Sequence, residues 1–311
     1  MSMTQQRAGR SRDRVLTMRG IGKRFGAVKA LTDVDFWVNE GEVVALVGDN
    51  GAGKSTLVKV LAGVHAPDAG TIEFDGDLVE IESPADAVDL GIATVFQDLA
   101  LCDNLDVVAN LWLGREIVEG TTLDEVDMEQ RTWTLLRELA AKIPSVRVPV
   151  ASLSGGQRQT VAIARSLIGD PRIVILDEPT AALGVAQTAE VLNLIERLRE
   201  RGHGVILISH NMADVMAVAD RVVVLRLGRN NGVYNASEIT SETLIAAITG
   251  AADNAVTRRA AERPDPPHRA GQPDPDSDSD LDEPGTHDAK IIRMPEGRTR
   301  RRKDPNGKGR A

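Results

Sequence analysis

Residues 43–56 have the sequence VVALVGDNGAGKST, in which an apolar run is followed by a glycine-rich loop and then by a helical pattern. The second half of this stretch matches the motif G-x-x-x-x-G-K-[ST], in which backbone N–H groups and a helix N-terminus converge on an anion, most often a nucleotide phosphate. The alternative is a glycine turn that caps an ordinary helix, which the preceding apolar run disfavours. The stretch therefore predicts a buried strand, a phosphate-binding loop and a helix.

Each residue type in this loop suits contact with phosphate. The residues predicted to bind it are Gly48, Asp49, Asn50, Gly51, Ala52, Gly53, Lys54, Ser55 and Thr56. Glycines let the main chain approach oxygen atoms at positions where a Cβ would collide. The Lys54 side chain supplies a positive charge, and the Ser55 hydroxyl can ligate Mg²⁺.

The composition limits the classes of protein to which the chain can belong. Its 311 residues are 42% hydrophobic and 27% charged, which is ordinary for a globular protein large enough to be an enzyme. A formal net charge of −9 argues against a general nucleic-acid-binding surface, so we expect no nucleic-acid partner. The single cysteine, Cys102, excludes an intrachain disulfide framework, and we expect it to be half-buried rather than catalytic.

The chain is expected to be soluble by itself. It contains no apolar run of the roughly 18–20 residues that span a bilayer, and residues 1–14 lack the apolar region of a signal peptide. Any role at a membrane would therefore come through a separate partner.

Residues 15–22 and 34–38 predict two strands of an antiparallel flap around a turn at Gly26. Phe25, directly before this turn, could stack on an adenine ring. It could equally fill the core of the flap. Residues 92–96 predict a core strand that ends at Gln97, whose amide would then reach a metal ion or an attacking water. Considered alone, Gln97 would be an ordinary surface residue.

From about Leu99 to Ile168 the pattern becomes helical, which predicts an inserted helical subdomain. Its apolar stripes are mostly expected to form the subdomain's own core. Four leucines exceed what a small core needs, and they could form a socket for a partner: Leu101, Leu105, Leu111 and Leu113. The predicted organisation is a flexible N-terminus at residues 1–14, one globular domain at 15–251 and a disordered, charged tail at 252–311.

A second helix start follows the sequence LSGGQ at residues 153–157. It offers a hydroxyl and glycine amides to phosphate oxygens through Ser154, Gly155, Gly156 and Gln157. The alternative is a serine N-cap followed by a glycine loop. Further along, an apolar run ends in Asp177 and Glu178, and a later one ends at His210. Because strand side chains alternate, we expect one acid to hold Mg²⁺ and the other to orient the attacking water, with His210 near the terminal phosphate.

In this order, the phosphate loop, Gln97, LSGGQ, Asp177-Glu178 and His210 resemble the ATP-binding cassette ATPases over about residues 15–251. The resemblance implies an α/β fold: a RecA-like P-loop NTPase core with an antiparallel β flap and an inserted α-helical subdomain. It also implies ATP and Mg²⁺ as ligands and hydrolysis of ATP to ADP and phosphate. The roles it implies are adenine stacking for Phe25, phosphate binding for Lys54, metal binding for Ser55, Gln97 and Asp177, general base for Glu178, switch histidine for His210 and coupling to a partner for Gln97.

Within that family the chain is similar to the ATPase subunits of bacterial importers of the ribose, xylose and fructose group. The similar phrases are FGAVKAL at 25–31, GDNGAGKST at 48–56, DLALCDNLD at 98–106, LGRE at 113–116 and ITGA at 248–251. The chain has one cassette, whereas many relatives of that group have two. It also has Gly184 where the family usually has an aspartate, so communication between the two sites of a dimer becomes an open question.

The resemblance implies a dimer of ATPase subunits, in which each ATP lies between the phosphate loop of one copy and Ser154–Gln157 of the other. It also implies transmembrane permease subunits, a sugar-binding protein that acts indirectly, and a location at the cytoplasmic face of the membrane. Four alternatives remain at this point: import of another small solute, an exporter ATPase, a soluble ATPase outside transport, and an inactive cassette with a scaffold role.

Overall fold

The computed structural model describes residues 14–251 of the chain. Within that range, the main sheet has six strands, of which β12 is antiparallel to β11 and the others are parallel to their neighbours. Across the sheet, the strands are β12 (Arg229–Asn235), β11 (Arg221–Arg226), β3 (Val43–Val47), β10 (Gly204–Ile208), β9 (Ile173–Asp177) and β6 (Ile92–Val95). The predicted tail at 252–311 and all of the predicted N-terminus except Arg14 lie outside the described residues.

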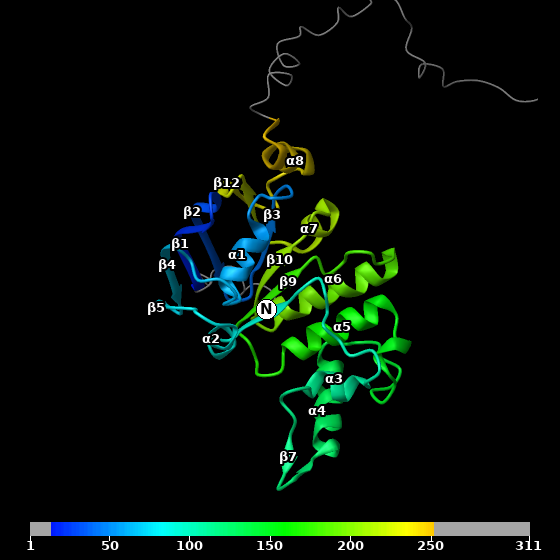
Figure 1. Ribbon diagram of the computed structural model, residues 1–311. Helices are drawn as coiled ribbons and strands as arrows, with labels where there is room; N and C mark the ends of the chain where they lie inside the picture. The colour runs from blue at the N-terminus through cyan, green and yellow to red at the C-terminus, as the bar shows by residue number, and fades with distance from the viewer. Residues whose placement is uncertain (1–13, 252–311) are drawn as a thin grey trace, which may run out of the picture. The chain divides into compact units, whose positions relative to one another are not determined.

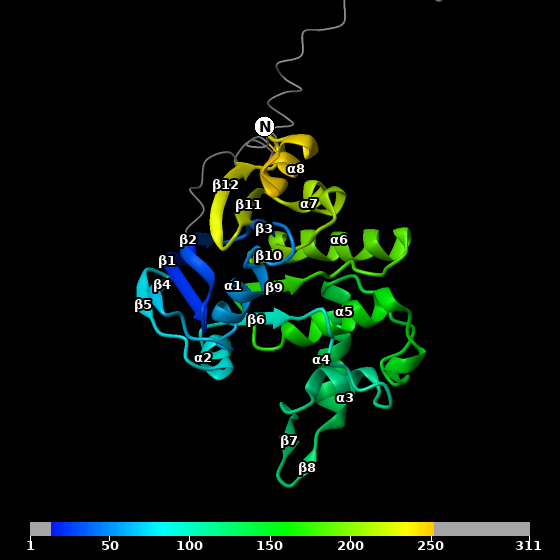
Figure 2. The same cartoon turned by 45° about the horizontal axis from the view of Figure 1, so that its top comes forward.

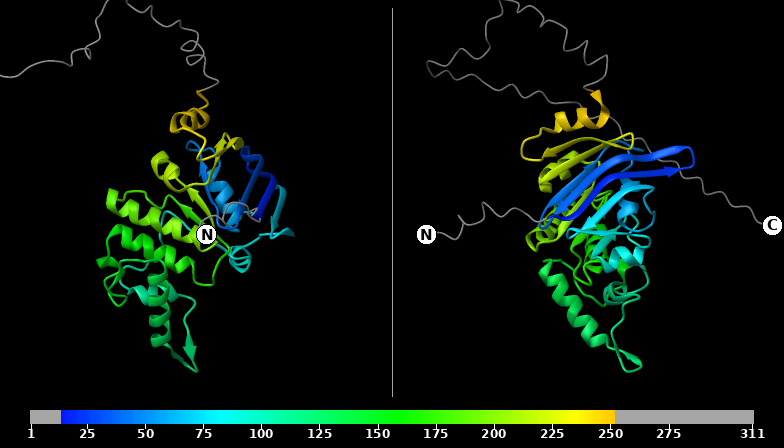
Figure 3. Two further views of the ribbon diagram at one scale, coloured as in Figure 1. Left: turned by 180° about the vertical axis from the view of Figure 1, so that it is seen from behind. Right: turned by 90° about the vertical axis from the view of Figure 1, so that its left-hand side faces the viewer.

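A second sheet forms the predicted antiparallel flap. Its strands, in spatial order, are β2 (Val28–Asn39), β1 (Arg14–Phe25), β4 (Ala69–Phe74) and β5 (Asp77–Val79). The β1–β2 hairpin turns at Gly26, whose φ of +58° suits glycine, so the predicted turn is confirmed. The strands are longer than the sequence predicts, and they form the long hairpin in the right-hand view of Figure 3.

The helices lie between and beyond these sheets (Figure 1). They are α1 (Lys54–Leu61), α2 (Pro84–Asp89), α3 (Val107–Trp112), α4 (Glu125–Glu138), α5 (Gly155–Ser166), α6 (Val185–Glu200), α7 (Met212–Val218) and α8 (Ser241–Thr249), with a 3₁₀ turn at Val150–Ser152. In Figures 1 and 2, α3 and α4 lie on the far side of α5 from the sheet. The predicted helices after the phosphate loop and after Ser154 are confirmed, and Cys102 is half-buried as expected.

The sequence predicts a helical region between Leu99 and Ile168, but this region also contains strands. A short hairpin, β7 (Val118–Glu119) with β8 (Thr122–Leu123), projects from it at the end farthest from the main sheet (Figure 2). Strands this short carry no period that a sequence pattern can detect. The sequence also missed β12 and α7, because β12 is polar and α7 spans only two turns.

Both faces of the central strands are buried, which explains their nearly continuous apolar sequences. In β9, Val174 and Leu176 face α3–α6, whereas Ile173 and Ile175 face α1 and the flap. A third cluster packs α7 and α8 against β11 and against the face of β3 that points away from α1. The main sheet is therefore held between helices on one face and α1 with the flap on the other.

A buried ion pair ties the two sheets together. The Arg221 guanidinium donates two hydrogen bonds to the Glu42 carboxylate, Nε to Oε1 at 2.8 Å and Nη2 to Oε2 at 3.1 Å. Nη2 also donates to the carbonyl oxygen of Trp37 in β2 at 2.8 Å, and Cζ lies 4.2 Å from the centroid of the Trp37 ring. Because both charged side chains are nearly inaccessible, removing one partner leaves the other charge buried and unpaired.

We expect Glu42→Ala to lower the free energy of unfolding by about 3–5 kcal/mol, measured by urea denaturation. The control is Arg131→Ala, which breaks the exposed Arg131–Asp127 pair on α4 and is expected to change that free energy much less, because solvent screens an exposed pair. Equal effects of the two substitutions would contradict a structural role for the buried pair.

Candidate nucleotide site

The candidate site lies where three central strands end together. In the parallel ladder, Leu46 of β3 lies beside Ile208 of β10, which lies beside Asp177 of β9. The phosphate loop begins two residues after Leu46, and His210 follows two residues after Ile208. The register of the sheet therefore brings the predicted phosphate loop, the acids and the histidine to one edge, as expected for a ligand site in an open α/β sheet.

Close packing dictates the glycines of the phosphate loop. A Cβ on Gly48, which has a φ of +154°, would lie 2.3 Å from the carbonyl oxygen of Leu225 in β11. A Cβ on Gly53, which has a φ of +107°, would lie 2.9 Å from the carbonyl oxygen of Ala30 in β2. The loop therefore passes between the main sheet and the flap in a path that only glycine allows at these positions.

The loop's charged and hydroxyl groups are open to a ligand. Nζ of Lys54 donates hydrogen bonds to the carbonyl oxygens of Gly48 at 2.7 Å and Asp49 at 3.1 Å, so the ammonium group lies over the loop. Ser55 is exposed, and within the described chain no side chain caps the N-terminus of α1 at Gly53. Uncapped N–H groups, the helix dipole and a nearby lysine fit a phosphate group.

The two acids differ in backbone conformation and surroundings. Asp177 is the last residue of β9, and burial raises the pKa of its carboxyl, with a further rise from the Glu178 charge that Lys54 and Lys59 oppose. Glu178 has left the strand conformation, with a φ of +51°. The strand alternation assumed from the sequence therefore does not extend to Glu178. The direction of the Glu178 side chain is set by its own left-handed backbone conformation, which is strained and is often found at functional sites.

Glu178 contacts His210 directly. Nδ1 of His210 lies 2.8 Å from Oε2 of Glu178, close enough for the ring N–H to donate a hydrogen bond to the carboxylate. The Glu178 side chain is 15% exposed and that of His210 75% exposed. The Glu178 backbone N–H also donates to the carbonyl oxygen of Ile208 at 2.9 Å, which anchors this acid to β10.

Gln97 lies in the same neighbourhood. A cavity of about 480 Å³ is lined by Gln97, Glu178 and Gly155, together with residues of the segment that precedes α6. Gln97 is exposed, two residues beyond the end of β6, where Val95 pairs with Leu176. Its amide is therefore near the acid that the sequence assigns as the base, and it is not an isolated surface group.

The LSGGQ segment forms the capping structure that the sequence left as its alternative. The Ser154 Oγ accepts a hydrogen bond from the Gln157 backbone N–H at 3.3 Å, and Gln157 Oε1 accepts one from the Ser154 backbone N–H at 2.9 Å. A Cβ on Gly155 or Gly156 would lie 3.0 Å from Leu183 or Gln187, so these glycines also allow close packing against the start of α6. Ser154 remains exposed.

Phe25 does not fill the core of the flap. Its side chain is 44% exposed, at the tip of β1, and it contacts the ring of His65. The interpretation of Phe25 as a core residue is therefore wrong. Stacking on a base stays a prediction.

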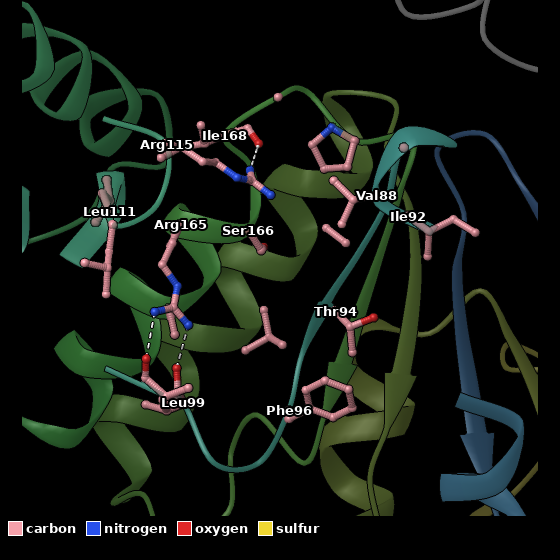
Figure 4. A pocket seen from close by; sticks show the side chains of 18 of the residues that line it. Val88, Ile92, Thr94, Phe96, Leu99, Leu111, Arg115, Arg165, Ser166 and Ile168 are labelled. Carbon is pink, nitrogen blue, oxygen red and sulfur yellow. Dashed lines mark hydrogen bonds between the residues drawn. The ribbon is translucent and has the colours of Figure 1, made fainter. Parts of the chain in front are cut away.

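Figure 4 shows a groove of about 500 Å³ between the main sheet and the α3–α5 region. Of the four leucines considered as a socket, Leu111 and Leu113 line this groove, whereas Leu101 lines the cavity beside Glu178. Two arginines of the groove were missed from the sequence. Arg165 of α5 donates to the carbonyl oxygens of Leu99 and Ala100, and Arg115 donates to that of Ile168.

Burial lowers the pKa of the Arg165 guanidinium, because the charged form loses solvation there. A basic residue near the end of an otherwise apolar helix face is the sequence signal that could have identified Arg165.

Among residues 14–251, no helix has the length and apolar character needed to cross a bilayer.

Comparison with known proteins identifies the family. A family model described as "ABC transporter" matches residues 31–181. The chain is 46% identical over 215 residues to the xylose/arabinose import ATP-binding protein XylG of Sulfolobus acidocaldarius, covering 69% of this chain and 86% of that protein. It is 44% identical over 245 residues to the fructose import ATP-binding protein FrcA of Rhizobium meliloti, covering 76% of this chain and 94% of that protein.

The fold agrees with that of solved cassettes. The crystal structure of the ADP conformation of MJ1267, an ATP-binding cassette of an ABC transporter, matches with a TM-score of 0.67 and 25% identity, over 80% of this chain and 99% of that chain. The RecA-like α/β fold and the family resemblance predicted from the sequence are thereby confirmed. The chain belongs to the ABC transporter family and is an ATP-binding, ATP-hydrolysing member of it.

Proposed function

We propose that the chain is the ATPase subunit of a monosaccharide importer and acts at the cytoplasmic face of the membrane through separate permease subunits. A sugar-binding protein would act through those permeases. Identities of 46% and 44% to proteins named for xylose/arabinose and fructose import support the sugar class. The alternative is the import of another small solute. A transport assay with monosaccharides distinguishes the two, because uptake of the sugar is expected only in the first case.

One observation carries the proposed site. The registered ends of β3, β10 and β9 place the phosphate loop, Glu178 and His210 at one edge of the sheet. We assign the phosphates to Gly48–Thr56, with the Lys54 ammonium as the positive charge that faces them. Glu178 then accepts the proton of the attacking water, and His210 holds the Glu178 carboxylate in place until the terminal phosphate arrives.

The residues present also fit Mg²⁺. Asp177 supplies a half-buried carboxylate whose pKa is raised by burial and by the Glu178 charge, and Ser55 and Gln97 supply further oxygen ligands. A bound Mg²⁺ would neutralise charge on the phosphates. The charge of the half-buried Asp177 thus destabilises the chain alone, and in the ligand complex it would bind Mg²⁺.

A second copy of the chain would complete the site. The cavities that Gly155 and Gln157 line include no residue of the phosphate loop within the described chain. The exposed Ser154 and the N-terminus of α5 are therefore assigned to the ATP of the partner copy in a head-to-tail dimer. The capping hydrogen bonds hold the backbone of Ser154 at the start of α5.

The groove of Figure 4 is assigned to the permease. It combines exposed apolar side chains, among them Phe96 and Leu113, with the two arginines described above. It is also joined to the catalytic edge by chain connectivity, since Phe96 and Asp98, the neighbours of Gln97 on both sides, line it. Movement of a permease element seated there would reach Gln97 through these two neighbours.

Glu178→Gln is expected to lower the ATPase turnover number by about 100-fold or more while leaving ATP affinity near that of the native protein, because only the proton acceptor is lost. Steady-state ATPase assays and equilibrium ATP binding measure the two effects. The matched control is Glu119→Gln, which makes the same carboxylate-to-amide change at an exposed position on β7. Native turnover in Glu178→Gln would refute the base assignment.

Asp177→Asn should stabilise the nucleotide-free protein by roughly 0.5 kcal/mol at pH 7, a small gain because solvent screens this half-buried group, and abolish Mg²⁺-dependent turnover. A carboxyl whose pKa is raised by folding destabilises the fold once it ionises, so the gain is present at neutral pH. It declines as the pH falls through the raised pKa and disappears below the unfolded-state value of 3.8. Denaturation at several pH values measures this, and lower stability of Asp177→Asn at pH 7 would contradict it.

Leu113→Asp is expected to remove most of the stimulation of ATPase activity by the permease, because it places a charge in the groove where an apolar contact is proposed. Activity without the permease should remain. Val118→Asp, another exposed apolar position, on the β7 hairpin outside the groove, serves as the control. If both variants were stimulated like the native chain, the groove would not be the docking site.

A further inference from the structure

The exposed aromatic ring at the tip of β1 has a second ring beside it. The rings of Phe25 and His65 meet edge to face, with their centroids 5.1 Å apart and their planes at 68°. Such pairs are a favoured geometry for aromatic side chains. Phe25 is 44% exposed, so part of its ring is open to solvent while its other side meets the His65 ring.

His65 is itself held by the helix of the phosphate loop. The backbone N–H groups of Val64 and His65 both donate hydrogen bonds to the carbonyl oxygen of Lys59 in α1, at 2.8 and 3.1 Å. These bonds fasten the segment that carries His65 to the C-terminal end of α1. The N-terminus of the same helix is the proposed phosphate site, so one short rigid element connects the two ends of a bound nucleotide.

An ion pair fastens the same segment to β1. Nζ of Lys23 donates to the Asp68 carboxylate at 2.9 Å and to the carbonyl oxygen of Ala66 at 2.6 Å. The other Asp68 oxygen accepts the backbone N–H of Arg24 at 2.7 Å, and the Asp68 N–H donates to the Gly22 carbonyl oxygen at 2.8 Å.

These bonds keep the segment in place next to the aromatic ring. The Lys23 hydrogen bond, and then that of the Arg24 N–H, lower the pKa of the Asp68 carboxyl below its ordinary value. The Lys23 ammonium also lies 5.8 Å from the centroid of the Phe25 ring. The two residues directly before Phe25 are thus both bonded to the segment that carries His65.

We propose that His65 is a positioning residue for nucleotide binding: its ring, held by α1 and by the Lys23–Asp68 pair, orients Phe25 as the platform for the nucleobase. This inference rests on the proposed function, in which Phe25 stacks on adenine. His65 acts through Phe25. It therefore contributes to binding of the base and leaves the phosphate contacts and the chemical step unchanged.

The test uses the full-length chain and His65→Ala. The KM for ATP is expected to rise about three- to tenfold, the value of one favourable aromatic pair, with kcat unchanged. Inhibition by inorganic tripolyphosphate, which has no base, should stay at the native level. His65→Phe, which keeps an aromatic edge beside Phe25, is expected to retain most of the native affinity. Val64→Ala, an exposed neighbour that makes no ring contact with Phe25, is the matched control.

A double-mutant cycle with Phe25→Ala separates positioning from a general effect on folding. In the Phe25→Ala background, His65→Ala should cause no further rise in KM, because the ring through which it acts is gone. Additive effects of the two substitutions, or a KM for His65→Ala equal to that of Val64→Ala, would overturn the inference. Should His65→Ala fold poorly, His65→Gln in the same cycle decides the question by the same criteria.

The outcomes also separate this inference from the proposed function. If the native chain neither binds nor hydrolyses ATP, the proposed function fails and the inference fails with it. If the native chain hydrolyses ATP and Phe25→Ala raises KM while His65→Ala does not, the nucleotide site stands and only the role of His65 is overturned.

Discussion

The close approach of the phosphate loop to two neighbouring backbones is the constraint on which the rest of the site depends. At Gly48 the loop lies against the Leu225 carbonyl of β11, and at Gly53 it lies against the Ala30 carbonyl of β2. The Gly228 N–H adds a hydrogen bond to the Ala52 carbonyl oxygen at 3.0 Å. The loop is therefore held between the main sheet and the flap by the protein's own packing. Such preorganisation reduces the entropic cost of ordering a binding loop.

The carboxylates at the same edge illustrate a conflict between stability and function. Burial and the charge of Glu178 both oppose ionisation of Asp177, and Glu178 itself adopts a left-handed backbone conformation that is unfavourable for a non-glycine residue. Neither feature benefits the fold. Both place negative charge where a Mg²⁺–nucleotide complex can use it, and the His210 contact compensates part of the charge in the chain alone.

A residue of the site can stabilise the fold and also be available to a ligand, so a structural role does not exclude a functional one. Ser154 and Gln157 form a capping box that starts α5, and the same serine stays exposed for a proposed second copy of the chain. Gly184, by contrast, has no side chain and makes no side-chain capping hydrogen bond at the N-cap of α6.

The sequence alone determined the local units: the apolar strands β3, β9 and β10, the loop and helix after β3, the flap turn at Gly26 and the helix after Ser154. Each depends on neighbours within a few residues, which is what a short pattern records. The tertiary structure decided the rest. The polar strand β12 exists because β11 pairs with it, the groove forms where separate segments meet, and Phe25 meets His65 from 40 positions away in the chain. Such contacts depend on register and packing between distant segments, and no local pattern of residues encodes them.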